Sequence, residues 1–131
     1  MKIMLDTNVL ISAFVFDGSV GKLLDLLFER GDDLYISEYV DSEFKEKLKL
    51  RWKDKAANVY KKYRSMCFVF CRSTDEILCD LRDPKDNPVL SDAIYHNVDV
   101  LVTGDKDFLD ANITQPSVLS PQNLYRELTE K

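Results

Sequence analysis

The sequence has little of the chemistry on which many enzymes depend. Its 131 residues include four glycines, none of them in a Gly-rich phosphate loop, one histidine and three cysteines. The lone His96 lies far along the chain from Cys67 and has no obvious catalytic partner. A cysteine–histidine metal site is therefore disfavoured, and the odd number of cysteines predicts reduced, structural thiols.

Long apolar runs are also missing. No stretch approaches the length needed to span a membrane, and Asp6 and Asn8 interrupt what would be the apolar region of a signal peptide. We therefore expect a cytoplasmic protein that makes no membrane contact. The length fits a single domain, residues 1–131, with room for a three-layer core.

Positive charge is scarce overall, because the net charge is −5, and this argues against a general nucleic-acid coat protein. The distribution is uneven, however, since half of all Lys and Arg residues fall between positions 45 and 64. One interpretation is a contact surface for phosphates, with a solvated helical face as the alternative. The candidates for nucleic-acid binding are Lys45, Lys49, Arg51 and Lys53.

Short apolar runs alternate with helical patterns along the whole chain. Strands are expected at residues 3–5, 34–36, 100–102 and 118–119, and residues 68–70 form either a strand or a packed loop. Helices are expected after Asp6, from 19 to 30, and at about 37–50, 54–66, 73–81, 87–97, 106–109 and from 121 onwards. The alternation predicts an α/β fold, a three-layer α/β/α sandwich around a mainly parallel sheet.

Several polar residues precede these helices and are expected to cap them. Thr7 or Asn8 would cap the first helix, Ser19 the second, and Ser37 the third. The remaining candidates are Ser73 or Thr74, Asp86 or Asn87, and Ser120, the last followed by Pro121 at the first helical position.

Two of the expected strands end in acids. Asp6 follows residues 3–5 directly, and Thr103-Gly104-Asp105-Lys106-Asp107 follows residues 100–102. The carboxyl ends of parallel strands meet at one edge of the sheet, where α/β proteins place their ligand crevice. Two strands that deliver acids to this edge predict a shared site, although Asp6 by itself could simply be a helix N-cap or a turn residue.

Two further acids are candidates for the same site. Glu43 projects from the third helix beside the apolar stripe of Val40, Phe44 and Leu48, so it points toward the protein. Asp86 stands just before a helix. Each has a structural alternative, an ordinary boundary glutamate for Glu43 and a helix cap for Asp86.

Four acids brought close together would repel one another unless a cation joined them. Mg²⁺ and Mn²⁺ prefer such oxygen ligands and would leave room for a phosphate group. Metal-assisted hydrolysis of a phosphodiester needs no histidine or cysteine nucleophile. The residues expected to support the carboxylates from a second shell are Thr7, Asn8, Ser37, Asn87 and Thr103.

The ordered set of motifs resembles the PIN-domain nucleases over essentially the whole chain. The matching pieces are Asp6-Thr7-Asn8-Val9-Leu10-Ile11-Ser12, Ser37 with Glu43, Asp86 with Val89, Leu90 and Ala93, and Thr103-Gly104-Asp105-Lys106-Asp107-Phe108. The resemblance implies an α/β/α sandwich and a ribonuclease dependent on Mg²⁺ or Mn²⁺. It also implies catalytic and metal-binding roles for Asp6, Glu43, Asp86 and Asp105, with Asp107 as a further ligand.

The segment Arg82-Asp83-Pro84-Lys85-Asp86-Asn87 is similar to a subgroup described as toxin components of toxin–antitoxin systems, the VapC-like toxins. That resemblance implies RNA as substrate, a small antitoxin protein as partner and a homodimer. Asp83 competes with Asp86 for the third acidic position. The spacing to Val89, Leu90 and Ala93 favours Asp86.

Two other functions are compatible with parts of the sequence. PIN domains also serve in RNA processing, and a non-catalytic RNA-binding PIN module would keep the fold without turnover; the presence of all four acids counts against that alternative. A phosphatase of the haloacid-dehalogenase type also has an Asp after its first strand. It requires a second Asp two positions later, where this chain has Asn8.

Overall fold

The centre of the protein is a parallel sheet of five strands. The computed structural model describes residues 1–16, 18–81 and 83–130, except for the side chain of Asp86. Its strands are β1 (Lys2–Leu5), β2 (Asp33–Ser37), β3 (Val69–Cys71), β4 (Val100–Val102) and β5 (Ser117–Leu119), in the order β3-β2-β1-β4-β5. Each neighbouring pair runs parallel, which confirms the predicted parallel sheet, and the strand order places β1 at its centre.

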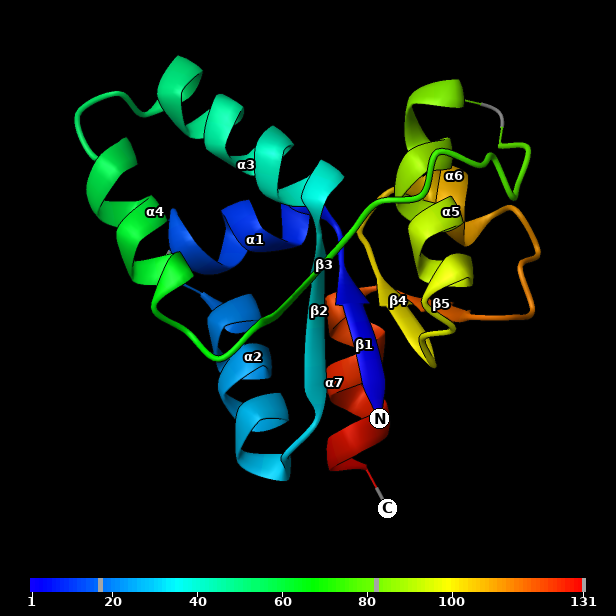
Figure 1. Cartoon of the computed structure of the whole chain (residues 1–131). Coiled ribbons are helices and arrows are strands. Elements are labelled where there is room, and N and C mark those ends of the chain that lie inside the picture. Colours follow the sequence, from blue (N-terminus) through cyan, green and yellow to red (C-terminus); the bar gives the residue numbers. More distant parts are fainter. Residues whose placement is uncertain (17, 82, 131) are drawn as a thin grey trace.

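Helices flank this sheet and complete the predicted α/β/α architecture (Figure 1). They are α1 (Thr7–Phe14), α2 (Ser19–Arg30), α3 (Glu38–Arg51), α4 (Ala56–Arg64), α5 (Asn87–Tyr95), α6 (Lys106–Leu109) and α7 (Pro121–Thr129). A short 3-10 turn, η1 (Pro84–Asp86), leads directly into α5. Helices α4 and α5 are shorter than predicted, within the usual uncertainty of helix ends.

The helix ends test the predicted caps. Ser37 Oγ accepts a hydrogen bond from Val40 N at 3.2 Å and caps α3, and Ser120 caps α7 in the same way. The prediction for Ser19 was wrong, because Ser19 is the first residue of α2 and Gly18 precedes it without a side-chain cap. At the other end of α2, Gly31 has φ 81°, a left-handed conformation that glycine adopts at low cost. The segment Asp17-Gly18-Ser19 has the residue types of a turn between α1 and α2, but Asp17 lies outside the described residues.

Residues 73–81 do not form the predicted helix. Their backbone N–H groups are held instead by side chains of α5: Thr74 N donates to Asp92 Oδ1 at 2.7 Å, and Leu78 N to Ser91 Oγ at 3.0 Å. The backbone N–H groups of this extended segment therefore have side-chain acceptors in place of the backbone carbonyls that would accept their hydrogen bonds in a helix. Figure 1 shows this segment crossing from β3 to the side of the sheet that carries α5.

The core gathers around β1 and an aromatic cluster beside it. Ile3, Met4 and Leu5 are fully buried, which explains the unbroken apolar run that begins the chain. Tyr63, from α4, is also fully buried, and its ring packs against Phe44 of α3 with a centroid separation of 4.8 Å. This contact joins α3 to α4, and the contact of Tyr63 with Phe14 joins α4 to α1.

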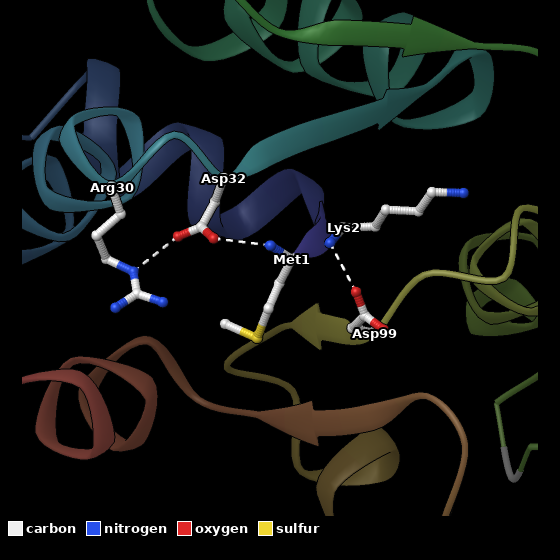
Figure 2. Close-up of polar contacts among 5 residues, drawn as sticks. All are labelled: Met1, Lys2, Arg30, Asp32 and Asp99. Carbon is white, nitrogen blue, oxygen red and sulfur yellow. Dashed lines mark hydrogen bonds and ion pairs between the residues drawn. The ribbon is translucent and has the colours of Figure 1, made fainter.

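The amino edge of the sheet is closed by charged groups. The amino-terminal NH₃⁺ of Met1 and the Arg30 Nε both lie 2.9 Å from carboxylate oxygens of Asp32 (Figure 2). Lys2 N donates to Asp99 Oδ2 at 2.8 Å and joins the turn before β4 to the same edge. Burial raises the pKa of Asp32, but the hydrogen bonds and charges of its two cationic partners outweigh this and lower it overall.

Replacing Asp32 by Asn is expected to lower the thermal midpoint at neutral pH by a few degrees, equivalent to about 1 kcal/mol or less. Because the folded-state pKa of Asp32 is lowered, its contribution is present above the unfolded pKa of about 3.9 and is lost as the pH falls through the folded value. Thermal unfolding of both proteins between pH 3 and pH 7 measures the difference. The exposed neighbour Asp33→Asn is the control; an Asp32 effect that stayed constant down to pH 3 would contradict the assignment.

The three cysteines are free thiols, in agreement with the expectation of a reduced protein. Burial, with help from the negative charges of Asp92 and Glu38, raises the pKa of Cys71 to about 11 and makes it unreactive near neutral pH. In residues 1–16, 18–81 and 83–130 there is no helix of the length and apolar character that crossing a membrane requires.

Candidate active site

Asp6 lies at the carboxyl end of the central strand, as predicted, and is 7% exposed. Its Oδ1 accepts a hydrogen bond from Thr7 N at 2.7 Å, so Asp6 itself caps α1, and the prediction that Thr7 or Asn8 would do so was wrong. Its Oδ2 accepts from Thr103 Oγ1 at 2.9 Å. The N-cap alternative is therefore real, but it accounts for only one of the two carboxylate oxygens.

Electrostatics connect Asp6 with two other predicted acids. Burial is the largest cause that raises the pKa of Asp6; the hydrogen bonds from Thr103 and Thr7 lower it, and the charges of Glu43 and Asp105 raise it again, with a net increase. Side chains from β1, α3 and the end of β4 thus act on one another across the carboxyl edge of the sheet. The structure brings Asp6, Glu43 and Asp105 into one region.

The Thr103 hydroxyl links two of these acids. It is fully buried, donates to Asp6 Oδ2, and accepts a hydrogen bond from Asp105 N at 3.1 Å. Asp105 in turn caps α6, where its Oδ1 accepts from Asp107 N at 2.9 Å. Thr103 thus holds the Asp6 carboxylate directly, and its supporting role in a metal site stays a prediction. Asp107 lies in the first turn of the same helix.

Ser37 acts through the helix that it caps. It is fully buried at the end of β2, and its hydrogen bond to Val40 N fixes the start of α3, the helix that carries Glu43. Asn8, by contrast, is exposed at the start of α1. Its predicted supporting role stays a prediction.

The third acidic position falls on the 3-10 turn before α5. Asp83 Oδ1 accepts a hydrogen bond from Lys85 N at 3.0 Å and caps η1. The backbone of Asp86 ends η1, and its side chain lies outside the described part of the structure. Asn87 does not cap α5, because its Oδ1 accepts from Leu81 N at 2.8 Å and so holds the loop before η1.

Among the side chains that the structure describes, no three carboxylates, imidazoles or thiols converge closely enough to form a metal-binding cluster on their own. The chemistry of the donors nevertheless fits a hard divalent ion. Asp6 is a buried acid in the field of two more acids, and its direct partners, an amide N–H and a hydroxyl, are neutral. Thr7 Oγ1, next to it in the chain, is buried and has no hydrogen-bond partner among the described residues. A cation at this edge would relieve the repulsion and the cost of burial.

Sequence reasoning missed the polar contacts that hold the loop between β3 and α5. Asp92 is almost fully buried, and its Oδ2 accepts from Ser73 Oγ at 2.7 Å, while Ser73 Oγ accepts from Tyr39 N at 2.9 Å. Ser73 N also donates to Glu38 Oε1 at 2.9 Å. These bonds join the start of α3 to α5, the two helices next to the site. The available signal was a charged residue, Asp92, on the apolar face of a predicted helix.

The basic segment lies on α3, α4 and their connection. Lys45, Lys49 and Lys53 line a groove between the two helices, with a volume of about 460 Å³. Arg51 is exposed at the end of α3 and is not among the groove residues. Of the four residues predicted to contact nucleic acid, the three lysines therefore share the groove and Arg51 lies outside it.

The sequence of the chain, from β1 into α6, matches a known family. The sequence model of the PIN domain aligns with residues 2–107, which span β1 to β4 and every acid of the candidate site. The chain belongs to the PIN domain family. An uncharacterized protein of Methanocaldococcus jannaschii is 32% identical to this PIN domain protein over 117 residues, covering 83% of this chain and 74% of the relative.

Solved structures share the fold at low sequence identity. A chain of the VapBC2 complex from Rickettsia felis, bound to a DNA fragment from its promoter, superposes with a TM-score of 0.70 at 20% identity, over 92% of this PIN domain protein and 98% of that chain. VapC20 of Mycobacterium tuberculosis, a toxin that cleaves the sarcin-ricin loop, gives a TM-score of 0.62 at 16% identity over 86% and 96%. The PIN domain endonuclease Utp24 gives 0.57 at 18% identity over 82% and 74%.

Proposed function

We propose that this PIN domain protein is an endoribonuclease that depends on Mg²⁺ or Mn²⁺. The observation that carries the proposal is the position of Asp6, which is buried at the carboxyl edge of the sheet and held by the neutral groups Thr7 N and Thr103 Oγ1. Burial and the charges of Glu43 and Asp105 raise its pKa. Acids held in this way need a cation to act together. The nuclease descriptions of VapC20 and Utp24, which share the fold, agree with this chemistry.

The residues proposed to hold the ion are Asp6, Glu43, Asp86, Asp105 and Asp107. When bound, a divalent ion neutralises these carboxylates and polarises a phosphodiester for attack by water. The chain's own contribution is to hold the acids in place before the substrate arrives. Thr103 and the α1 amide fix Asp6, and the Ser37 cap fixes the helix of Glu43.

We further propose that the biological role is that of a toxin in a toxin–antitoxin pair, with a small antitoxin as partner and a homodimer as the working form. The support is the motif around Asp83 and Asp86, together with the likeness to chains described as VapBC2 and VapC20. RNA processing, the alternative that the sequence left open, stays the second candidate, and the likeness to the endonuclease Utp24 agrees with a nuclease in either role. The cytoplasmic location expected from the sequence also stays a prediction.

The test of the activity is cleavage of a mixed single-stranded RNA pool by the purified protein with Mg²⁺, with Mn²⁺ or with EDTA, alongside calorimetric measurement of Mn²⁺ binding. Cutting that requires the metal supports the nuclease. Undiminished cutting in EDTA would refute the metal dependence. Metal binding without cleavage of any RNA would favour the non-catalytic RNA-binding alternative.

Charge reversal tests the role proposed for the basic segment. In the variant Lys49→Glu, Arg51→Glu, Lys53→Glu, RNA binding is expected to weaken by at least about tenfold at low salt, because positive residues attract the RNA backbone through their field. The slope of log K against log salt should become shallower, by about 0.7 for each lost phosphate contact on a single strand. Fluorescence anisotropy with a labelled oligouridine measures both quantities.

The single variants Lys49→Glu and Lys22→Glu form a matched pair for this prediction. Both residues are exposed and both changes alter the net charge equally, but Lys22 lies on α2. Only Lys49→Glu should change the salt slope. Equal effects of the two variants would reduce the basic segment to a general contribution to net charge.

A further inference from the structure

The groove between α3 and α4 combines positive rims with an apolar floor. Lysines stand along both helices and their connection, and none of the described lining residues is acidic. The floor is built from aliphatic side chains, among them Leu48, which is 1% exposed and belongs to the core. The lining residues are Lys45, Leu48, Lys49, Lys53, Ala56, Ala57, Tyr60 and Lys61. A volume of about 460 Å³ is within the usual size of ligand-binding clefts.

This groove and the candidate active site lie on different flanks of α3. With about 100° of rotation per residue, Lys45 and Lys49 point roughly 120–160° away from Glu43 around the helix axis. Glu43 acts on Asp6, whereas the two lysines face α4. The helix itself therefore separates the groove from the acids, and an occupant of the groove leaves the carboxyl edge of the sheet uncovered.

The aromatic ring of the groove is already engaged. Tyr60 OH donates to the Asp41 carboxylate at 3.0 Å, and Lys45 Nζ lies over the Tyr60 ring, 5.4 Å from its centroid. A face covered by a lysine is a poor platform for stacking a nucleobase. A phosphodiester backbone would use the lysines of the rims, but it would leave the floor of Leu48, Ala56 and Ala57 without a partner.

We propose that the α3–α4 groove is a docking site for an acidic amphipathic helix of a partner protein. The apolar stripe of such a helix buries against the floor, where Ala56 and Ala57 permit a close approach, and its flanking carboxylates meet the lysines on either rim. Four lysines make the groove positive although the net charge of the protein is −5, so the groove favours a partner that carries negative charge. This partner does not depend on the acids of the candidate active site, but it shares Lys49 and Lys53 with the RNA contact proposed above, so the peptide and RNA are expected to compete for these lysines.

The experiment measures binding of a labelled peptide to the full chain by fluorescence anisotropy, in EDTA and without RNA. The probe is a helical peptide with leucines along one stripe and glutamates beside them; the control peptide has lysine in place of each glutamate. Binding of the glutamate peptide is expected to be at least tenfold tighter, since each lysine–carboxylate contact is lost or reversed in the control. Failure of the glutamate peptide to bind, or equal binding of both peptides, would overturn the proposal.

Two protein variants locate the peptide. Ala57→Trp fills the floor of the groove without changing charge, whereas Asn58→Trp places the same side chain at the next exposed position of α4, outside the lining. Ala57→Trp should weaken peptide binding at least tenfold and Asn58→Trp should not; unchanged thermal midpoints show that both are folded. Equal effects would overturn the location. If Ala57→Trp weakened oligouridine binding and left the peptide unaffected, the groove would be an RNA site instead.

Discussion

The variant Asp6→Asn is expected to lose metal-dependent RNA cleavage completely while keeping the fold. Asn has nearly the same volume and can still accept the hydrogen bond from Thr7 N, so α1 remains capped. It removes the one acid that is both buried and in contact with Thr103. The loss of cleavage rate should exceed the about 10–100-fold effects usual for residues that only support a metal ligand.

The same variant should be more stable than the natural protein when no metal is present. Burial disfavours the charged form of Asp6, which is why its pKa is raised, and Asn removes that charge. Thermal unfolding in EDTA should give a higher midpoint for Asp6→Asn. Addition of Mn²⁺ should raise the midpoint of the natural protein and not that of the variant, because a ligand stabilises only a state that binds it.

The matched control for Asp6 is Asp25→Asn, the same change at an exposed position on α2. It should leave both cleavage and the response to Mn²⁺ intact. Full activity in Asp6→Asn would show that Asp6 is not part of the reaction. A lower midpoint for Asp6→Asn than for the natural protein in EDTA would show that Asp6 stabilises the fold by capping α1 more than its buried charge destabilises it.

The largest effect on stability is expected from Tyr63→Ala. Tyr63 is fully buried, and its ring packs edge-on against Phe14 and Phe44 with centroids 5.7 and 4.8 Å away. Removing a buried aromatic side chain costs about 3–5 kcal/mol, a large part of the about 5–15 kcal/mol that stabilises a typical protein. Urea unfolding followed by circular dichroism measures the free energy of unfolding.

Tyr63→Phe separates packing from hydrogen bonding. It keeps the ring and removes only the hydroxyl, which donates to Asp41 Oδ1 at 2.8 Å. Because Asp41 is partly exposed and also accepts from Tyr60, the expected loss is about 1–2 kcal/mol. Equal losses in Tyr63→Phe and Tyr63→Ala would assign the stability to the hydrogen bond and contradict the packing argument.

The strands were predictable because their signal is local. A run such as Ile3 to Leu5 has no polar side chain to expose, so it fits only a buried strand, and Asp6 directly after it marks the carboxyl edge. The helix predicted at 73–81 failed for the opposite reason. Ser73 and Thr74 resemble a helix start, but Asp92, nearly twenty positions further on, captures Ser73 Oγ and Thr74 N. The residues near Ser73 in the sequence give no sign that these distant hydrogen bonds will form in place of a helix.

For the site, the sequence identified residue types and edges but not their contacts. It placed Asp6 and Asp105 after two strands that end at the same edge of the sheet, and the effects of Glu43 and Asp105 on the Asp6 pKa agree with that placement. It did not indicate that the Thr103 hydroxyl joins both aspartates, since that bond depends on the register in which Leu5 lies opposite Val102. The ligand roles of the acids stay predictions.

The hydrogen bond from Thr103 Oγ1 to Asp6 Oδ2 joins residues that are 97 positions apart. Contacts of such long sequence separation form only after the intervening chain has been brought together, and they are late and slow compared with local structure. During synthesis, Asp6 leaves the ribosome well before β4 exists. In the growing chain, Asp6 is therefore present long before Thr103 and Asp105 have been synthesised. The site is assembled only when translation of the domain is nearly complete.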